Sequence, residues 1–210
     1  MTEFWESSFI EKQTMWGFEP ADAAIVTKDL FLEKGIQDIL IPGIGYGRNA
    51  KVFLDHGIAV TGIEISQTAI ELARTHYGNS IPIYHGSVTD MPFDHKLYDG
   101  IFCFALIHLL SLRERRQLIK DCYQQLQPGG YMTFSVISKK APTFGQGQPI
   151  SKDRFKTMHG VNLFFYDETS IKQEFGKYGL TTITAIDEPV KNFKDKAPIP
   201  FWLITCRKEG

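Results

Sequence analysis

An apolar segment that runs directly into closely spaced glycines constrains the fold of this chain more than any other feature. Residues 38–42 read Asp-Ile-Leu-Ile-Pro, and Gly43, Gly45 and Gly47 follow at alternate positions, ahead of a helix-like segment. Glycine allows a sharp turn and a close approach of the backbone to a ligand, because it has no Cβ. The pattern predicts either a ligand-binding turn or an ordinary turn between a strand and a helix.

The second predicted strand, which begins at residue 58, ends in an acid, Glu64. In doubly wound α/β folds, an acid at the end of the second strand accepts hydrogen bonds from ribose hydroxyls. The glycine turn and this acid together predict a site for a nucleoside cofactor. Ile44, between two of the glycines, and Ile65, next to Glu64, belong to the same predicted site.

The spacing of the glycines indicates which nucleoside the site takes. A dinucleotide site has the spacing G-x-G-x-x-G, so that the start of the helix meets a pyrophosphate. Here the third glycine comes one residue early, and Arg48 stands at the dinucleotide position. The spacing G-x-G-x-G resembles motif I of the class I S-adenosylmethionine-dependent methyltransferases. That resemblance implies S-adenosylmethionine, which has no phosphate, as the cofactor.

The resemblance extends to particular branches of the family and includes one departure. Ile-Pro-Gly at 41–43 is similar to the thiopurine and thiol methyltransferase branch, whereas Gly-Arg-Asn at 47–49 resembles the tellurite-resistance type. The family usually has an acid two residues before the first glycine, where this chain has Ile41. The chain departs from the commonest form of the motif but not from the class.

Composition is typical of one modest-sized enzyme. The chain has 210 residues, 43% of them hydrophobic, which suits a single domain over residues 1–210. Its net charge of −1 argues against a nucleic-acid partner, which needs a basic patch. No apolar run approaches the length of a membrane span, and the acidic, aromatic amino terminus is untypical of a signal peptide. Three separated cysteines without a C-x-x-C pair predict a reduced, cytoplasmic protein with no metal site.

Helical and strand-like segments alternate along the chain, which predicts an α/β fold. The family resemblance implies a Rossmann-like three-layer sandwich with a seven-stranded, mostly parallel sheet whose last strand is antiparallel. Strands are predicted over 38–41, 58–64, 80–84, 98–104, 131–137, 180–187 and 200–207.

The predicted helices have recognisable start and stop signals. Residues 1–35 form an N-terminal cap and a helix, with Pro20 at its first position and Gly35 as its C-terminal cap. Further helices follow the glycines, begin after Ser66, span 111–126 and run from Asp167 to about 179. The Gly/Pro/Lys-rich stretch 138–163 has little periodicity and is expected to be a long loop, and a charged hairpin joins the last two strands.

The segment after the third strand resembles the adenine-side motif of the same family, G-D-x-x-x-L-P-F. Ser87 stands where the family has an acid that accepts from the adenine amine, and the backbone N–H of Val88 would donate to the ring. A serine hydroxyl also accepts hydrogen bonds, although a neutral acceptor is weaker than a charged one. Ser87 could equally serve a purely structural turn.

The fourth strand runs into the segment that corresponds to the family's motif IV. The Asn/Asp-Pro-Pro-aromatic tetrapeptide of amino-directed enzymes is missing here, but the carbonyl groups near Phe104 could hold the cofactor's methionyl amine. His108 is a candidate catalytic base, because histidine titrates near neutral pH. It could instead orient the following helix through backbone hydrogen bonds. Cys103 is expected simply to pack in the strand.

Two further segments are expected to enclose the site. Residues 14–20 resemble the Trp…Gly…Pro approach of the thiopurine and thiol branch, in which a tryptophan, here Trp16, lies against the cofactor. The alternative is that Trp16 only packs the helix onto the sheet. Residues 138–166 are the predicted substrate-side wall, with Phe144, Arg154, Phe155 and His159 as possible contacts.

These patterns lead to one functional hypothesis and two alternatives. The leading hypothesis is methyl transfer from S-adenosylmethionine to a small-molecule acceptor by in-line displacement, for which alignment and desolvation provide most of the acceleration. A thiol would need little base assistance, whereas an oxygen acceptor would recruit His108. The alternatives are a nicotinamide oxidoreductase and a non-catalytic cofactor-binding protein of the same fold. Sequence alone leaves the acceptor atom and the oligomeric state open.

Overall fold

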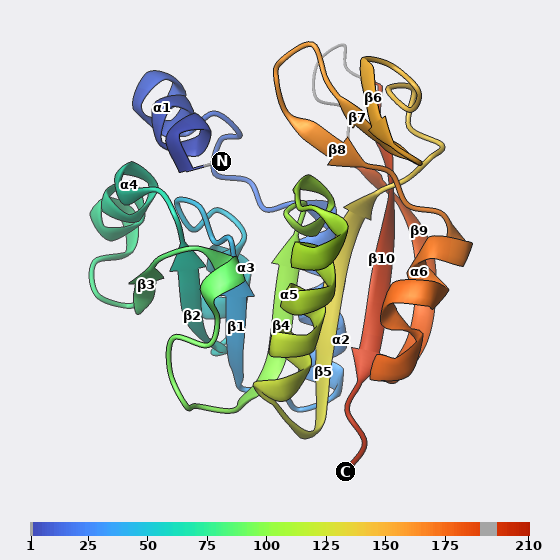
Figure 1. The fold of residues 1–210 in the computed structure, drawn as a ribbon. Coiled ribbons are helices and arrows are strands. Elements are labelled where there is room, and N and C mark those ends of the chain that lie inside the picture. The colour runs from blue at the N-terminus through green and yellow to red at the C-terminus, as the bar shows by residue number, and fades with distance from the viewer. Residues whose placement is uncertain (1, 190–196) are drawn as a thin grey trace.

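The computed structural model describes residues 2–189 and 197–210, and a sheet of seven strands lies at its centre. The strands are β1 (Asp38–Pro42), β2 (Ala59–Glu64), β3 (Ile83–His85), β4 (Tyr98–Phe104), β5 (Leu126–Ile137), β9 (Leu180–Glu188) and β10 (Ile199–Arg207). Their order is β3-β2-β1-β4-β5-β10-β9 (Figure 1). Neighbours from β3 to β5 are parallel, and β10 lies antiparallel between β5 and β9. The predicted Rossmann-like sheet is confirmed.

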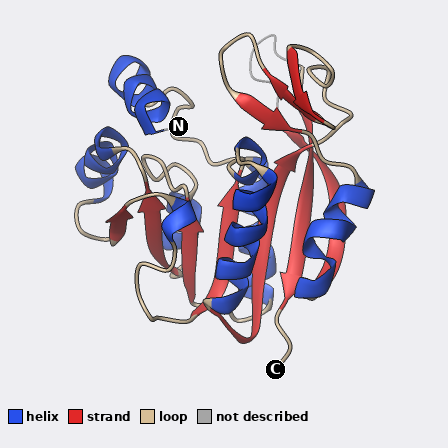
Figure 2. Ribbon diagram, viewed as in Figure 1, coloured by secondary structure: helices blue, strands red, loops and turns tan. Residues whose placement is uncertain are grey.

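Helices cover both faces of the sheet and complete the three layers (Figure 2). Helices α2 (Asp22–Glu33) and α3 (Ala50–Leu54) pack on one face with β1 and β2. Helices α5 (Leu112–Gln124) and α6 (Glu168–Phe175) pack on the other face with β4, β5 and β10. Helix α4 (Gln67–Tyr77) follows β2, and single 3₁₀ turns lie at Val88–Asp90, Ile107–Leu109 and Gly176–Tyr178. Among the described residues, no helix has the length and apolarity that crossing a membrane requires.

The helices begin largely where their capping residues predict. Ser66 Oγ accepts from the Ala69 amide at the start of α4, at 3.1 Å, and Ser111 opens α5 with a capping box. Several predicted boundaries are wrong. Strand β5 begins at Leu126 instead of residue 131, and β3 spans Ile83–His85 instead of residues 80–84. Helix α2 begins at Asp22 with Ala21 as its N-cap, so Pro20 precedes the helix instead of starting it.

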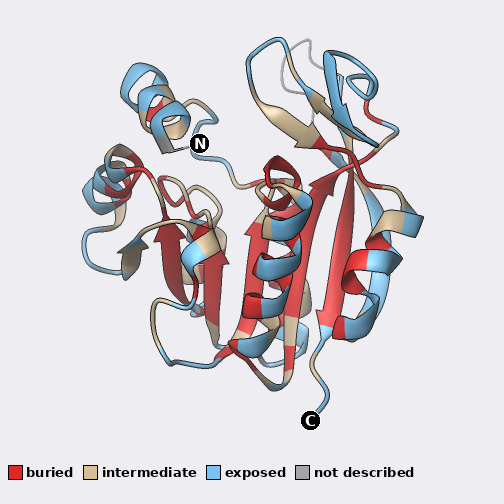
Figure 3. Ribbon diagram, in the orientation of Figure 1, coloured by how far each residue is buried: buried red, intermediate tan, exposed pale blue. Residues whose placement is uncertain are grey.

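The central strands are the most deeply buried part of the molecule (Figure 3). They are covered by α2 and α3 on one side and by α5 and α6 on the other, which explains their nearly continuous apolar sequences. A buried ion pair joins α5 and α6: Arg115 Nη2 lies 2.7 Å from Glu174 Oε1. Tyr166 Oη also donates to Glu174, at 2.9 Å, so the pair is hydrogen-bonded on both sides.

The stretch 138–163, predicted as a loop, contains a small antiparallel sheet instead. Its strands are β6 (Gln148–Ser151), β7 (Arg154–Lys156) and β8 (Asn162–Phe164). Most of their residues are exposed or half-buried, so no alternation of apolar and polar residues marks them in the sequence (Figure 3). The predicted charged hairpin between β9 and β10 falls mainly on residues 190–196, outside the described residues.

The first residues form helix α1 (Thr2–Lys12), which lies beside α4 at the upper edge of the sheet (Figure 1). The Glu6 carboxylate anchors it there. It accepts from Ser66 Oγ at 2.6 Å and from Thr68 Oγ1 at 2.5 Å. These bonds attach α1 to the start of α4, immediately after the end of β2.

Candidate functional site

A cavity of about 620 Å³ lies at the edge of the sheet where β1, β2 and β4 end. The glycine turn, the end of β2 and the segment after β3 form one end of it. The segment after β4 and the facing ends of β9 and β10 form the other end. The sequence-predicted residues that line this cavity are Trp16, Gly43, Ile44, Gly45, Glu64, Ile65, Ser87, Val88 and Phe104.

The glycine turn needs glycine for two different reasons. Gly43 and Gly45 both have positive φ, at 71° and 58°, and both line the cavity. A Cβ at Gly43 would lie 2.1 Å from Leu106 Cδ1, so the segment after β4 packs directly on this backbone. Gly47 also has positive φ, but it does not line the cavity; a Cβ there would meet the Tyr77 ring at 2.7 Å. Its place in the predicted cofactor site is not supported by this geometry.

Glu64 at the end of β2 is held by three backbone amides. One oxygen accepts from Gly45 N at 2.8 Å, and the other accepts from Ile65 N and Ser66 N, both at 2.9 Å. The side chain is only 5% exposed. Burial raises the pKa of Glu64, while these amide hydrogen bonds act in the opposite direction. The Glu64 carboxylate is therefore held between the glycine turn and α4, and Glu64 lines the cavity.

Ser87 and Val88 lie beside Glu64 on the cavity wall. Ser87 caps the 3₁₀ turn that follows β3, because its Oγ accepts from Thr89 N at 3.2 Å and shares a hydrogen bond with Thr89 Oγ1. The residue therefore has a structural role and lines the cavity at the same time. Both readings of Ser87 fit this position.

An aromatic cluster from the amino-terminal segment covers this end of the cavity. Trp16 stacks on Tyr46, with the ring planes at 14° and the centroids 6.2 Å apart, and Phe9 packs against both rings. Tyr46 Oη donates to the Gly17 carbonyl at 2.7 Å and accepts from the Trp16 amide at 3.1 Å. Trp16 therefore packs the segment onto the glycine turn and lines the cavity, and its contact with the cofactor stays a prediction.

Arg48 is the one basic side chain among the described residues that line the cavity. Its Nη1 donates to the Trp16 carbonyl at 3.1 Å, and its guanidinium lies 5.9 Å from the centre of the Phe104 ring. Burial lowers the pKa of Arg48, and the nearby Glu188 acts against that shift. Arg48 thus connects the amino-terminal segment to the far end of the cavity.

His108 does not fit the role of catalytic base. It is 5% exposed and does not line the cavity, and its Nδ1 accepts from the Ile137 amide at 3.2 Å. Burial lowers the pKa of His108 to about 3, so the ring is neutral at ordinary pH. His108 instead holds the backbone of β5 against the segment after β4, which is neither of its two predicted roles.

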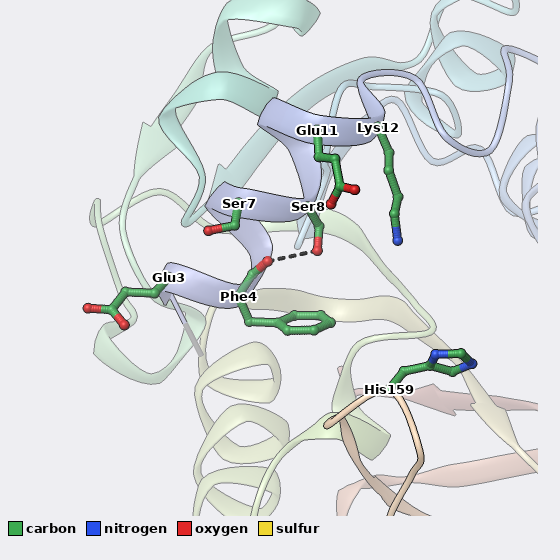
Figure 4. Close-up of a pocket in the computed structure, with 7 residues that line it drawn as sticks. All are labelled: Glu3, Phe4, Ser7, Ser8, Glu11, Lys12 and His159. Atoms are coloured by element: carbon green, nitrogen blue, oxygen red, sulfur yellow. Dashed lines mark hydrogen bonds between the residues drawn. The ribbon is translucent and has the colours of Figure 1, made fainter.

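The predicted substrate-side wall is also placed elsewhere. No residue from 138–166 lines the large cavity. Of the four proposed contacts, His159 lines a second, smaller hollow, and Phe144, Arg154 and Phe155 line neither. This second hollow, of about 490 Å³, lies between α1 and the turn that holds His159 (Figure 4). It lacks the glycine turn and Glu64.

Several cavity residues were missed by sequence reasoning. They are mostly apolar residues from the segment after β4 and from β10, together with a carboxylate at the end of β9: Leu106, Leu109, Leu110, Glu188, Ile199 and Phe201. Only Glu188 had a usable signal, since an acid at the carboxyl end of a strand lies at the ligand-binding edge of such a sheet.

Comparison with known proteins agrees with this geometry. Residues 40–134 match the family model of a methyltransferase domain. A probable S-adenosylmethionine-dependent methyltransferase of Mycolicibacterium smegmatis is 26% identical over 121 residues, which are 58% of this chain and 45% of that protein. The ubiquinone biosynthesis O-methyltransferase of Coxiella burnetii is 27% identical over 104 residues, 48% of this chain and 44% of that protein. The matched segment thus spans less than half of these relatives.

Solved structures share the fold over nearly the whole chain. The Burkholderia thailandensis 1,6-didemethyltoxoflavin-N1-methyltransferase, with bound 1,6-didemethyltoxoflavin and S-adenosylhomocysteine, has a TM-score of 0.74 at 18% identity and covers 100% of this chain and 87% of its own. The magnesium protoporphyrin IX methyltransferase of Synechocystis, with bound S-adenosylmethionine, has a TM-score of 0.69 at 12% identity, with coverages of 99% and 95%.

Residues 40–134 therefore match a methyltransferase domain, and the chain has the fold of solved S-adenosylmethionine-dependent methyltransferases. The resemblance to the thiopurine, thiol and tellurite-resistance branches stays a prediction.

Proposed function

We propose that this protein transfers a methyl group from S-adenosylmethionine to a small-molecule acceptor. One observation carries the proposal: Gly43, Gly45 and the buried Glu64 carboxylate line the same end of one cavity, at the carboxyl edge of a parallel sheet. This is where open α/β folds bind nucleosides.

The residues at this end suit each part of the cofactor. Glu64 would accept from the ribose hydroxyls, because a carboxylate with three amide donors still has free lone pairs. Ser87 and Val88 would contact adenine, and the backbone near Gly43 and Phe104 would hold the methionyl group. When bound, S-adenosylmethionine supplies an electrophilic methyl group on a positively charged sulfur.

The protein's own contribution to catalysis is alignment and exclusion of water. The aromatic cluster of Phe9, Trp16 and Tyr46 lines the cavity on the side of α1, and an aromatic ring near the cofactor's cationic sulfur would favour its binding. No base is needed for an acceptor that reacts as an anion, which agrees with the remote position of His108.

A small-molecule acceptor is supported by the cavity volume of about 620 Å³ and by the charge of the chain. A net charge of −1 does not favour a nucleic-acid substrate. The structural neighbour from Burkholderia thailandensis is named for 1,6-didemethyltoxoflavin, which it holds together with S-adenosylhomocysteine. The three cysteines are unpaired and buried, which supports a reducing, cytoplasmic setting for the reaction.

Calorimetric titration tests this proposal against the nicotinamide alternative. We expect one S-adenosylhomocysteine molecule to bind per chain and NAD to give no binding heat. Tight NAD binding, or no binding of S-adenosylhomocysteine to folded protein, would overturn the proposal.

A further inference from the structure

Two phenylalanine rings form a wall at the end of the cavity opposite Glu64. Phe104 at the end of β4 and Phe201 in β10 both line the cavity, and their rings lie nearly parallel, at 4° with centroids 6.3 Å apart. Strand register produces this arrangement. Phe104 pairs with Ser135 of β5, which pairs in turn with Leu203, so Phe201 lies on the same face of the sheet two residues away. The wall is therefore fixed by three adjacent strands.

The surroundings of this wall are mostly apolar. They come from the segment after β4 and from the facing ends of β9 and β10: Ala105, Leu106, Leu109, Leu110, Pro189, Ala197 and Ile199. Such a lining favours binding of a ligand with a large apolar face, and the Arg48 guanidinium lies 5.9 Å from the centre of the Phe104 ring as a charged group beside the wall.

One carboxylate stands at the edge of the wall. Glu188 pairs with Ile199 across β9 and β10, so its side chain shares the face of Phe201. It lines the cavity and is 8% exposed. Its two oxygens accept from Ala23 N at 2.6 Å and from Asp22 N at 3.2 Å. A carboxylate accepts about four hydrogen bonds, so Glu188 can still accept from a ligand.

We propose that the methyl acceptor is a flat aromatic molecule with a hydrogen-bond donor on its ring, such as a hydroxyl, thiol or ring N–H group. Its ring lies against the Phe104–Phe201 wall, and its donor group binds the Glu188 carboxylate. This inference rests on the proposed function and adds the class of its substrate. Phe201 then selects acceptors with a flat aromatic ring, and Glu188 selects acceptors that carry a hydrogen-bond donor.

Three probes of one skeleton separate these two requirements. They are 2-naphthol, its fully saturated counterpart 2-decalol, which is not flat, and naphthalene, which lacks the hydroxyl. Their dissociation constants are measured by calorimetry on the full chain saturated with S-adenosylhomocysteine, so no turnover is needed. We expect 2-naphthol to bind about three- to tenfold more tightly than 2-decalol, from ring contacts, and more tightly than naphthalene by a similar factor, from the hydrogen bond.

Variants assign the two preferences to their residues. Phe201→Leu should weaken 2-naphthol and leave 2-decalol nearly unchanged, and Phe104→Leu gives an independent second reading of the same wall. Glu188→Gln should weaken 2-naphthol and leave naphthalene unchanged. Matched controls are Phe144→Leu and Asp187→Asn, which lie outside the cavity. Thermal unfolding is recorded for each variant, because Glu188 also holds the first amides of α2.

The outcomes distinguish this inference from the proposed function. If the chain binds S-adenosylhomocysteine but binds 2-naphthol and 2-decalol equally, or binds neither, the aromatic acceptor is refuted and the proposed function stands. If the preference for 2-naphthol exists but survives both phenylalanine variants and Glu188→Gln, the assigned residues are wrong. If S-adenosylhomocysteine itself does not bind, the proposed function fails first.

Discussion

Removal of the Glu64 carboxylate should weaken cofactor binding strongly. In the structure the carboxylate lies at the cavity with its position fixed by Gly45, Ile65 and Ser66. Hydrogen bonds to a charged group contribute about 1.5–3 kcal/mol. Loss of the ribose contacts should therefore raise the dissociation constant of S-adenosylhomocysteine about 10- to 150-fold.

The same substitution disturbs the fold, and the experiment has to separate the two effects. Glu64→Ala leaves three backbone amides without their acceptor, and a buried amide without a partner costs about 1–3 kcal/mol. Glu64→Gln keeps one acceptor oxygen in place and is the milder variant. Glu71→Ala, an exposed acid on α4, is the matched control.

The assay is calorimetric titration of S-adenosylhomocysteine into each variant, at a temperature where thermal unfolding shows the protein to be folded. Both Glu64 variants should bind weakly, and Glu71→Ala should bind as the wild type does. Unchanged affinity in folded Glu64→Ala would refute the reasoning, since Glu64 would then be only a cap for the turn.

Three further predictions concern pH, the glycine turn and the amino-terminal segment. Burial raises the pKa of Glu64, so the affinity for S-adenosylhomocysteine should fall as the pH drops towards that raised pKa and the carboxylate becomes protonated. Glu64→Ala should lack this pH dependence. A pH-independent affinity in the wild type would contradict the prediction. Gly45→Val should abolish binding, because φ at Gly45 is 58° and the added side chain would enter the cavity; normal binding by a folded variant would show the turn to be structural. Deletion of residues 1–18 should weaken cofactor binding while the core stays folded. S-adenosylhomocysteine should also slow hydrogen exchange around Trp16 as well as around Gly45. Protection around Gly45 alone would show that the amino-terminal segment has only a structural role.

The buried His108 gives a separate prediction about stability. Its pKa is lowered to about 3 in the folded protein, whereas an unfolded histidine titrates near 6.5. Between these values the unfolded state binds more protons, so this group should lower the stability as the pH falls from about 6.5. His108→Asn keeps an acceptor for the Ile137 amide and should remove that part of the pH dependence in chemical denaturation. An NMR titration of the His108 ring between pH 6 and 7 would contradict its assignment as a neutral buried group.

The parts of the fold that follow local rules could be predicted from the sequence. The glycine turn directly follows β1, and Glu64 is the last residue of β2. Their positions next to these strands were enough to predict that Gly43, Gly45 and Glu64 line one cavity. The capping residues Ser66 and Ser111 act within one helical turn and were equally readable.

The far end of the site could not be predicted, because it depends on pairing between distant strands. Phe201 and Glu188 reach the cavity only through the register of β9 and β10 against β5, which no local pattern specifies. The sheet of β6–β8 could not be predicted for another reason. Its strands are short and largely exposed or half-buried, so their sequences do not alternate between apolar and polar residues. The sequence left the role of His108 open between a base and a structural residue, because its position in the chain does not specify its depth of burial.

Transfer of a labelled methyl group tests the central claim most directly. Folded protein that binds S-adenosylhomocysteine is incubated with methyl-tritiated S-adenosylmethionine and a panel of small thiols and phenols, and the label is followed into the acceptor. We predict a labelled product together with an equal amount of S-adenosylhomocysteine, and much less of both with Glu64→Ala. Binding of S-adenosylhomocysteine without transfer to any member of the panel would contradict the account and favour a non-catalytic cofactor-binding protein.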